Sequence, residues 1–166
     1  MDALVAKFIG LLEDQKRLYG SLLAVLQAEK AAALCSHLDA LNQAVKEKEN
    51  VLLKIRILEE QRINMLGQVA EALGLPSAQV TLRHLAQRLS EPFAGQVQAC
   101  RSNLLSLTQS IQELNNSNRK LFSRSLELIK GSINLLGSLR APAPVYAPTG
   151  KLGTALASGS VLSGNV

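Results

Sequence analysis

The chain has 166 residues, a formal net charge of +5 and an aromatic content of 3%, with no tryptophan. This composition favours helices packed side by side over an enzyme built around aromatic side chains, and the length suits one domain. No apolar run is long enough to span a bilayer, and no basic segment precedes an apolar stretch at the start. We therefore expect a cytoplasmic protein without membrane insertion.

The positive charge is concentrated in the second half of the chain. Residues 1–78 carry nine basic and ten acidic side chains, whereas residues 79–140 carry eight basic and three acidic ones. The basic residues are widely spaced, and no aromatic residues lie between them to stack on bases. We therefore expect a solvated basic face or an acidic protein partner, and no nucleic acid.

The first predicted helix covers residues 2–32, because apolar side chains recur at steps of three and four in a stripe wide enough to face two neighbours. No glycine or proline separates it from the next helix. Ser36, with Asp39 three residues later, resembles a capping box, so we place an N-cap at Ser36. One continuous helix through this point is the alternative.

The second predicted helix covers residues 37–73. It ends before Gly74 and Pro76, because glycine at C′ and proline just beyond it stop a helix. A short helix follows at residues 81–89, and Thr81 is its predicted N-cap.

The longest predicted helix covers residues 93–139. It follows Ser90, a candidate N-cap, and Pro92, which a first turn tolerates. Its apolar seam keeps a heptad repeat for six heptads without a proline, which indicates one helix with a buried face. The a positions are Val97, Leu104, Ile111, Asn118, Ser125, Ser132 and Leu139, and the d positions are Cys100, Leu107, Leu114, Leu121, Leu128 and Leu135.

Polar residues interrupt the seams of the two longer helices. They are Lys48, Glu59, Arg62, Asn118, Ser125 and Ser132. We interpret them as devices that fix the register, as a buried Asn does in coiled coils; the alternative is a loosely packed bundle able to accept another helix. We expect helices 37–73 and 93–139 to run antiparallel, with Leu52 at about the same height as Asn118.

The composition changes after the long helix. Residues 141–166 contain three Pro, four Gly, five Ala and a single charge, Lys151. Such a segment buries little area. We therefore predict two parts, a helical bundle at 1–140 and a mobile C-terminal tail at 141–166.

The sequence offers no complete set of residues for catalysis or metal binding. Cys35, His37 and Asp39 are metal-capable, but at positions i, i+2 and i+4 of one helix they do not converge, and nothing completes four ligands. We interpret Cys35 and Cys100 as buried free thiols and His37 as a surface residue. We predict no enzyme activity, no metal and no cofactor.

Several short motifs follow one another in a fixed order. They are Leu11-Leu12-Glu13 with Tyr19, Glu29, Lys48-Glu49, Leu58-Glu59, Arg62, Leu73-Gly74, Leu114-Asn115, Asn118-Arg119, and Tyr146 with Gly150. The Leu-Asn-x-x-Asn-Arg block and the Tyr-x-x-x-Gly of the tail are the most specific. In this order the motifs resemble the FlgN-like flagellar export chaperones over nearly the whole chain.

This resemblance implies an all-α fold: an antiparallel helical bundle of three long helices plus one short helix, with a flexible C-terminal tail. It also implies a cytoplasmic chaperone that binds hook–filament junction (hook-associated) proteins and delivers them to components of the flagellar type III secretion apparatus. Two alternatives remain. One is a chaperone of another secretion system, and the other is a coiled-coil structural or adaptor protein that self-associates through its seam.

A second apolar stripe lies beside the heptad seam of the long helix, which gives this helix more apolar surface than one neighbour needs. We therefore expect a helix of the client to dock on the C-terminal half, with the tail as a clamp. The alternative is that the stripe packs on the first helix and the tail is a spacer. The predicted contact residues are Asn118, Leu121, Phe122, Ser125, Leu126, Ile129, Ile133 and Tyr146.

Overall fold

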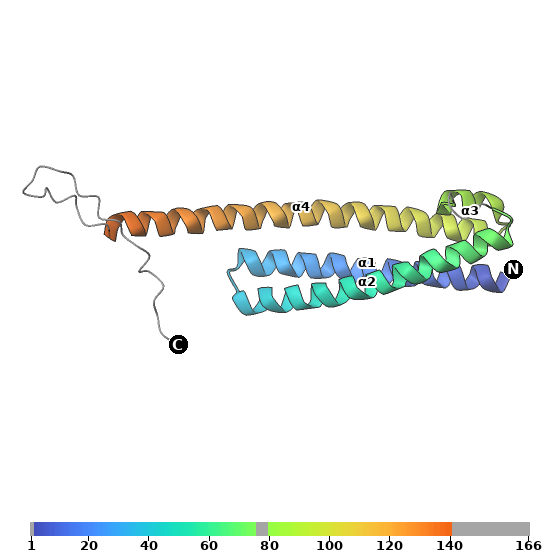
Figure 1. The fold of residues 1–166 in the computed structure, drawn as a ribbon, viewed down its shortest axis with the longest axis horizontal. Helices are drawn as coiled ribbons and strands as arrows, with labels where there is room; N and C mark the ends of the chain where they lie inside the picture. Colours follow the sequence, from blue (N-terminus) through green and yellow to red (C-terminus); the bar gives the residue numbers. More distant parts are fainter. Residues whose placement is uncertain (1, 76–79, 141–166) are drawn as a thin grey trace, which may run out of the picture. The chain divides into compact units, whose positions relative to one another are not determined.

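The structure is a computed structural model that describes residues 2–75 and 80–140, and this part of the chain contains helices and no strand (Figure 1). The helices are α1 (Asp2–Leu34), α2 (Leu38–Ala72), α3 (Leu82–Arg88) and α4 (Phe93–Arg140). Each boundary lies within two residues of its predicted position, so the all-α prediction is confirmed. Among the described residues, no helix is both long enough and apolar enough to cross a membrane. Pro76 and the predicted tail, 141–166, lie outside this part.

The chain divides into two compact units, and the boundary falls inside α4. The first unit is Met1–Leu121, with α1, α2, α3 and the first part of α4. The second unit is Phe122–Val166, of which the structure describes the rest of α4. The two units are described separately below.

The turn between α1 and α2 differs from the prediction. Ser36 has φ 53°, in the left-handed region. Its amide donates to the carbonyl of Ala33 at 3.2 Å, and the amide of His37 donates to that of Ala32 at 3.0 Å. This is a Schellman turn that closes α1. The N-cap of α2 is therefore His37, whose Nδ1 accepts from the amide of Ala40 at 3.2 Å. The prediction of Ser36 as the N-cap is wrong because its backbone ends the preceding helix.

The end of α2 uses the same turn with the predicted residue. Gly74 has φ 67°, its amide donates to the carbonyl of Glu71 at 3.0 Å, and the amide of Leu75 donates to that of Ala70 at 2.9 Å. Glycine adopts this conformation without a steric penalty, which is why it stops the helix here.

The predicted caps of the last two helices have different outcomes. The Oγ1 atom of Thr81 accepts from the amide of His84 at 3.3 Å, which confirms the cap of α3. At the start of α4, the amide of Gly95 donates to the carboxylate of Glu91 at 3.3 Å. In the described structure, the side chain that accepts a hydrogen bond from a backbone amide at this end of the helix is therefore that of Glu91, and not that of Ser90 as predicted.

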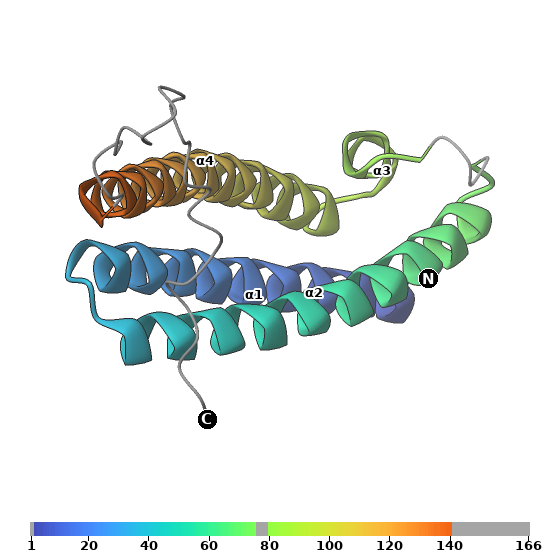
Figure 2. The same ribbon diagram turned by 60° about the vertical axis from the view of Figure 1, so that its left-hand side comes forward.

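Within the first unit, α1 and α2 form an antiparallel hairpin, and they lie side by side in both views (Figure 2). Two contacts set the direction of α4 against α1, Glu13 with Cys100 and Lys30 with Ser117, and both join residues that are 87 positions apart. A constant difference means that α4 runs parallel to α1 here, and hence antiparallel to α2, as predicted. The shared core consists of Val5, Phe8, Leu12, Val69, Leu85, Cys100 and Leu104.

Candidate binding surface and the polar layers that flank the core

A buried polar layer joins three helices of the first unit around Glu29. This side chain of α1 is 3% exposed, forms an ion pair with Lys48 of α2, and accepts a hydrogen bond from Nδ2 of Asn118 at 3.1 Å. The same nitrogen donates to the carbonyl of Leu26 at 2.9 Å. A buried carboxylate needs such partners, so the layer fixes the register of the three helices. The residue of α2 at the height of Asn118 is therefore Lys48, one turn from the predicted Leu52.

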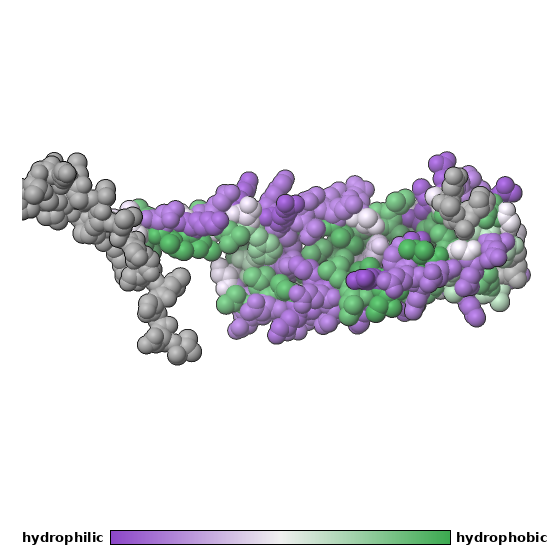
Figure 3. All heavy atoms as spheres, in the orientation of Figure 1, coloured by the Kyte–Doolittle hydropathy of each residue, from purple (hydrophilic) through white to green (hydrophobic). Residues whose placement is uncertain are grey.

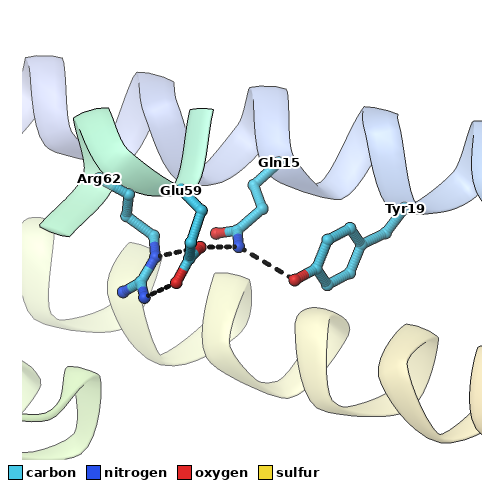
Figure 4. Close-up of polar contacts among 4 residues, drawn as sticks. All are labelled: Gln15, Tyr19, Glu59 and Arg62. Carbon is cyan, nitrogen blue, oxygen red and sulfur yellow. Dashed lines mark hydrogen bonds and ion pairs between the residues drawn. The ribbon is translucent and has the colours of Figure 1, made fainter. Parts of the chain in front are cut away.

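A second polar layer lies further along the same unit, where four side chains point from α1 and α2 toward α4 (Figure 4). Nε2 of Gln15 donates to Oε2 of Glu59 at 2.8 Å and to the hydroxyl of Tyr19 at 3.2 Å. Arg62 pairs with Glu59, and this hydrogen-bonded guanidinium lowers the pKa of the Glu59 carboxyl against the opposing effect of burial. Thus Lys48, Glu59 and Asn118 each make a polar contact with α1, which supports the interpretation of these three residues as register devices, whereas Arg62 pairs with Glu59 of its own helix.

The two thiols are free, and their environments differ. Cys35 is exposed, so the prediction that it is buried is wrong: it lies at the open turn after α1. Cys100 is 2% exposed, as expected for a core residue, and its Sγ lies 3.2 Å from Oε1 of Glu13. Burial, together with that carboxylate, raises the pKa of the Cys100 thiol to about 11, so it stays protonated at neutral pH. The described residues contain no cluster of three side chains able to hold a metal ion.

The second unit presents an exposed apolar face on α4. Successive residues of a helix are about 100° apart, so the leucine and isoleucine side chains of this face cover roughly half of the helix circumference. They form two rows along the helix, and Ser125 and Ser132 lie between these rows. Figure 3 shows this apolar side of the helix in green and the polar side in purple. We call this surface the α4 stripe. Its members, each more than half exposed, are Leu126, Leu128, Ile129, Ile133, Leu135, Leu136 and Leu139.

The predicted contact residues differ in their surroundings. Asn118 is buried in the first unit, 2% exposed, and its side chain bonds to α1; Leu121 closes that unit and is half-buried. Ile129 and Ile133 belong to the α4 stripe. Tyr146 lies outside the described residues. Of the remaining predicted residues, Leu126 also belongs to the stripe, Ser125 is exposed and Phe122 is half-buried.

Sequence reasoning did not find the partners within the polar layers. Gln15 was not singled out, although it is 6% exposed and touches both Glu59 and Tyr19. A polar residue on an otherwise apolar face of α1 was the available signal. Glu29, Lys48 and Asn118 were recognised as motif residues, and the structure adds that they meet in one layer.

Comparison with models of known protein families gives a match. A model of the family described as FlgN protein matches residues 1–154. No curated protein and no solved structure matches the chain. The matched range covers both polar layers and the α4 stripe.

Proposed function

Because this chain belongs to the FlgN family, a family of flagellar export chaperones, we propose that it binds hook–filament junction proteins in the cytoplasm and delivers them to the flagellar type III export apparatus. The observation that carries the proposal is the α4 stripe. A soluble partner is the simplest way to remove so many neighbouring leucine and isoleucine side chains from water.

The stripe fits a helical client segment. Leu126, Ile129, Ile133 and Leu136 follow steps of three and four, the spacing at which one helix docks on another. Full burial of one leucine or isoleucine contributes about 1.5–3 kcal/mol, so a few such anchors suffice for specific binding after the cost of association. Tyr146 of the tail is proposed as an additional contact.

Titration calorimetry with purified hook-associated proteins tests the proposal. The stripe variant is Leu126→Gln with Ile129→Gln, because glutamine keeps a good helix propensity while removing apolar area. The matched control is Arg124→Gln with Lys130→Gln, on the polar side of the same segment. We expect the stripe variant to lose at least about tenfold in affinity, which corresponds to about 1.4 kcal/mol, and the control to bind within about threefold of the wild type. Equal affinity of the stripe variant and the wild type would refute the site.

Light scattering separates a binding module from a self-associating coiled coil. The proposal expects a monomer at micromolar concentration for both the wild type and the stripe variant. A wild-type dimer that the stripe variant abolishes would instead assign the stripe to self-association.

A further inference from the structure

A hollow of about 480 Å³ opens beside the second polar layer, inside the first unit. Helices α1, α2 and α4 contribute side chains to it, together with α3 and its N-cap, so the hollow is formed by the fold and not by one loop. The side chains that line it include Gln15, Glu59, Arg62, Arg83, Arg101 and Leu104.

The hollow is lined by more positively charged than negatively charged side chains. Of its three arginines, Arg62 is paired with the single carboxylate, Glu59. No ion pair among residues 2–75 and 80–140 includes Arg83 or Arg101. These two cations also line a neighbouring hollow together with Glu91, whose carboxylate accepts from the amide of Gly95. Two guanidinium groups that line the hollow therefore remain to bind an anion.

One of the residues that line the hollow, Gln15, also carries a buried hydrogen-bond acceptor without a donor. The carboxylate of Glu59 only accepts, so the amide nitrogen of Gln15 must face it, and this fixes the orientation of the Gln15 amide. The Oε1 atom of Gln15 is then left buried with no partner in the described structure. A buried acceptor of this kind costs free energy until a donor reaches it.

We propose that this hollow docks a protein segment in which an acidic side chain stands beside an apolar one. The carboxylate would bind Arg83 and Arg101, a main-chain N–H would donate to Oε1 of Gln15, and the apolar side chain would contact Leu104 and its neighbours. Anion, donor and apolar group occur together in an acidic peptide. The residues of this site belong to the first unit and those of the α4 stripe to the second, so this proposal is tested independently of the client proposal.

Nuclear magnetic resonance of the full chain tests this assignment with two capped peptides, acetyl-Leu-Glu-Leu-Leu-amide and the matched acetyl-Leu-Gln-Leu-Leu-amide. We expect saturable shifts of the Gln15 side-chain amide and of the Nε–H signals of Arg83 and Arg101 with the glutamate peptide. The glutamine peptide should bind about tenfold more weakly. Equal binding of both peptides, or no shift at Gln15 at millimolar glutamate peptide, would overturn the proposal.

Two arginine variants complete the test. Arg83→Gln with Arg101→Gln should abolish the difference between the two peptides, while the chain stays folded because Arg83 is exposed and Arg101 is only partly buried. Arg88→Gln, on the same helix as Arg83 and outside the lining, is the matched control and should keep the tenfold preference. Free glutamate that binds as tightly as the glutamate peptide would overturn the peptide assignment and identify a small-molecule site. A preference that survives the double variant would also contradict it.

Discussion

The two parts of α4 share one heptad pattern and have opposite surroundings. In the first unit, Val97 is 0% and Leu104 is 8% exposed, whereas in the second unit Leu128 is 73% and Leu139 is 74% exposed. All four occupy a or d positions of the same repeat. A heptad repeat therefore specifies a helix with an apolar face, and what covers that face is decided by other residues.

The polar a positions show what those residues are. Asn118 is held in the first unit because Glu29 and Leu26 supply acceptors for its amide. Ser132 in the second unit is exposed, and its hydroxyl donates to the carbonyl of Leu128 in its own helix. The buried Asn118 thus has hydrogen-bond partners on another helix, whereas the exposed Ser132 forms a hydrogen bond within its own helix.

Truncation of one leucine in each part should produce the largest difference. Leu104→Ala should destabilise the chain by about 2–5 kcal/mol, because it removes buried atoms and leaves a cavity. Leu128→Ala should change the free energy of unfolding by about 0.5 kcal/mol or less, because the side chain is already in water. Urea denaturation measures both. Similar losses would show that the Leu128 side chain is buried in solution.

Removal of the carboxylate at the centre of the first polar layer should have the next largest effect. Glu29→Ala leaves Lys48 and Asn118 without their shared acceptor, and we expect a loss of about 1–3 kcal/mol, since Lys48 is partly solvated. Glu49→Ala, next to Lys48 and exposed, is the matched control and should have little effect. If Glu29→Ala left the free energy of unfolding unchanged, the layer would not hold the register of the helices.

Thiol labelling compares the same two parts of α4 directly. In a Cys35→Ser background, Cys100 should react with Ellman's reagent at pH 8 at least about tenfold more slowly than a cysteine introduced by Ser132→Cys in a chain that also carries Cys100→Ser. Burial and Glu13 keep the Cys100 thiol protonated, with its pKa raised to about 11. Both variants should label fully in denaturant. Fast labelling of Cys100 in the native chain would contradict its burial.

Acid should weaken the first unit through Glu59. Its pKa is lowered in the folded chain by Arg62, so its contribution to stability is present above the unfolded value of about 4.3 and is lost as the pH falls through the folded pKa. The gap in urea midpoint between the wild type and Glu59→Gln should therefore shrink below about pH 4. Glu127→Gln, at an exposed position of the second unit, should leave the midpoint unchanged. A constant gap for Glu59→Gln would contradict the ion pair.

Sequence reasoning found the helices because their apolar period and stop signals are local. Gly74 was identified from its residue type alone, whereas Ser36 was assigned as a cap because nothing in its side chain reveals a left-handed backbone. The partners of Asn118 on α1 were missed because a pattern along one helix does not say which neighbour is nearest. The hollow was missed for the same reason, since Gln15, Arg83 and Arg101 are far apart in the sequence.

The α4 stripe itself was predictable, and what binds it was only implied by the family resemblance. Leu126, Ile129 and Ile133 follow helical spacing, which shows in the sequence as a second apolar row. Their exposure depends on the absence of a covering neighbour, which periodicity does not encode.

Hydrogen–deuterium exchange of the intact chain, with and without a purified hook-associated protein, tests the central claim most directly. Without the client, amides of 122–140 should exchange faster than those of 93–121, because only the latter lie in the packed unit. Saturating client should slow exchange in 122–140 and leave 93–121 nearly unchanged. Protection confined to 93–121, or no change in 122–140 when binding is complete, would contradict the assignment of the α4 stripe as the client site.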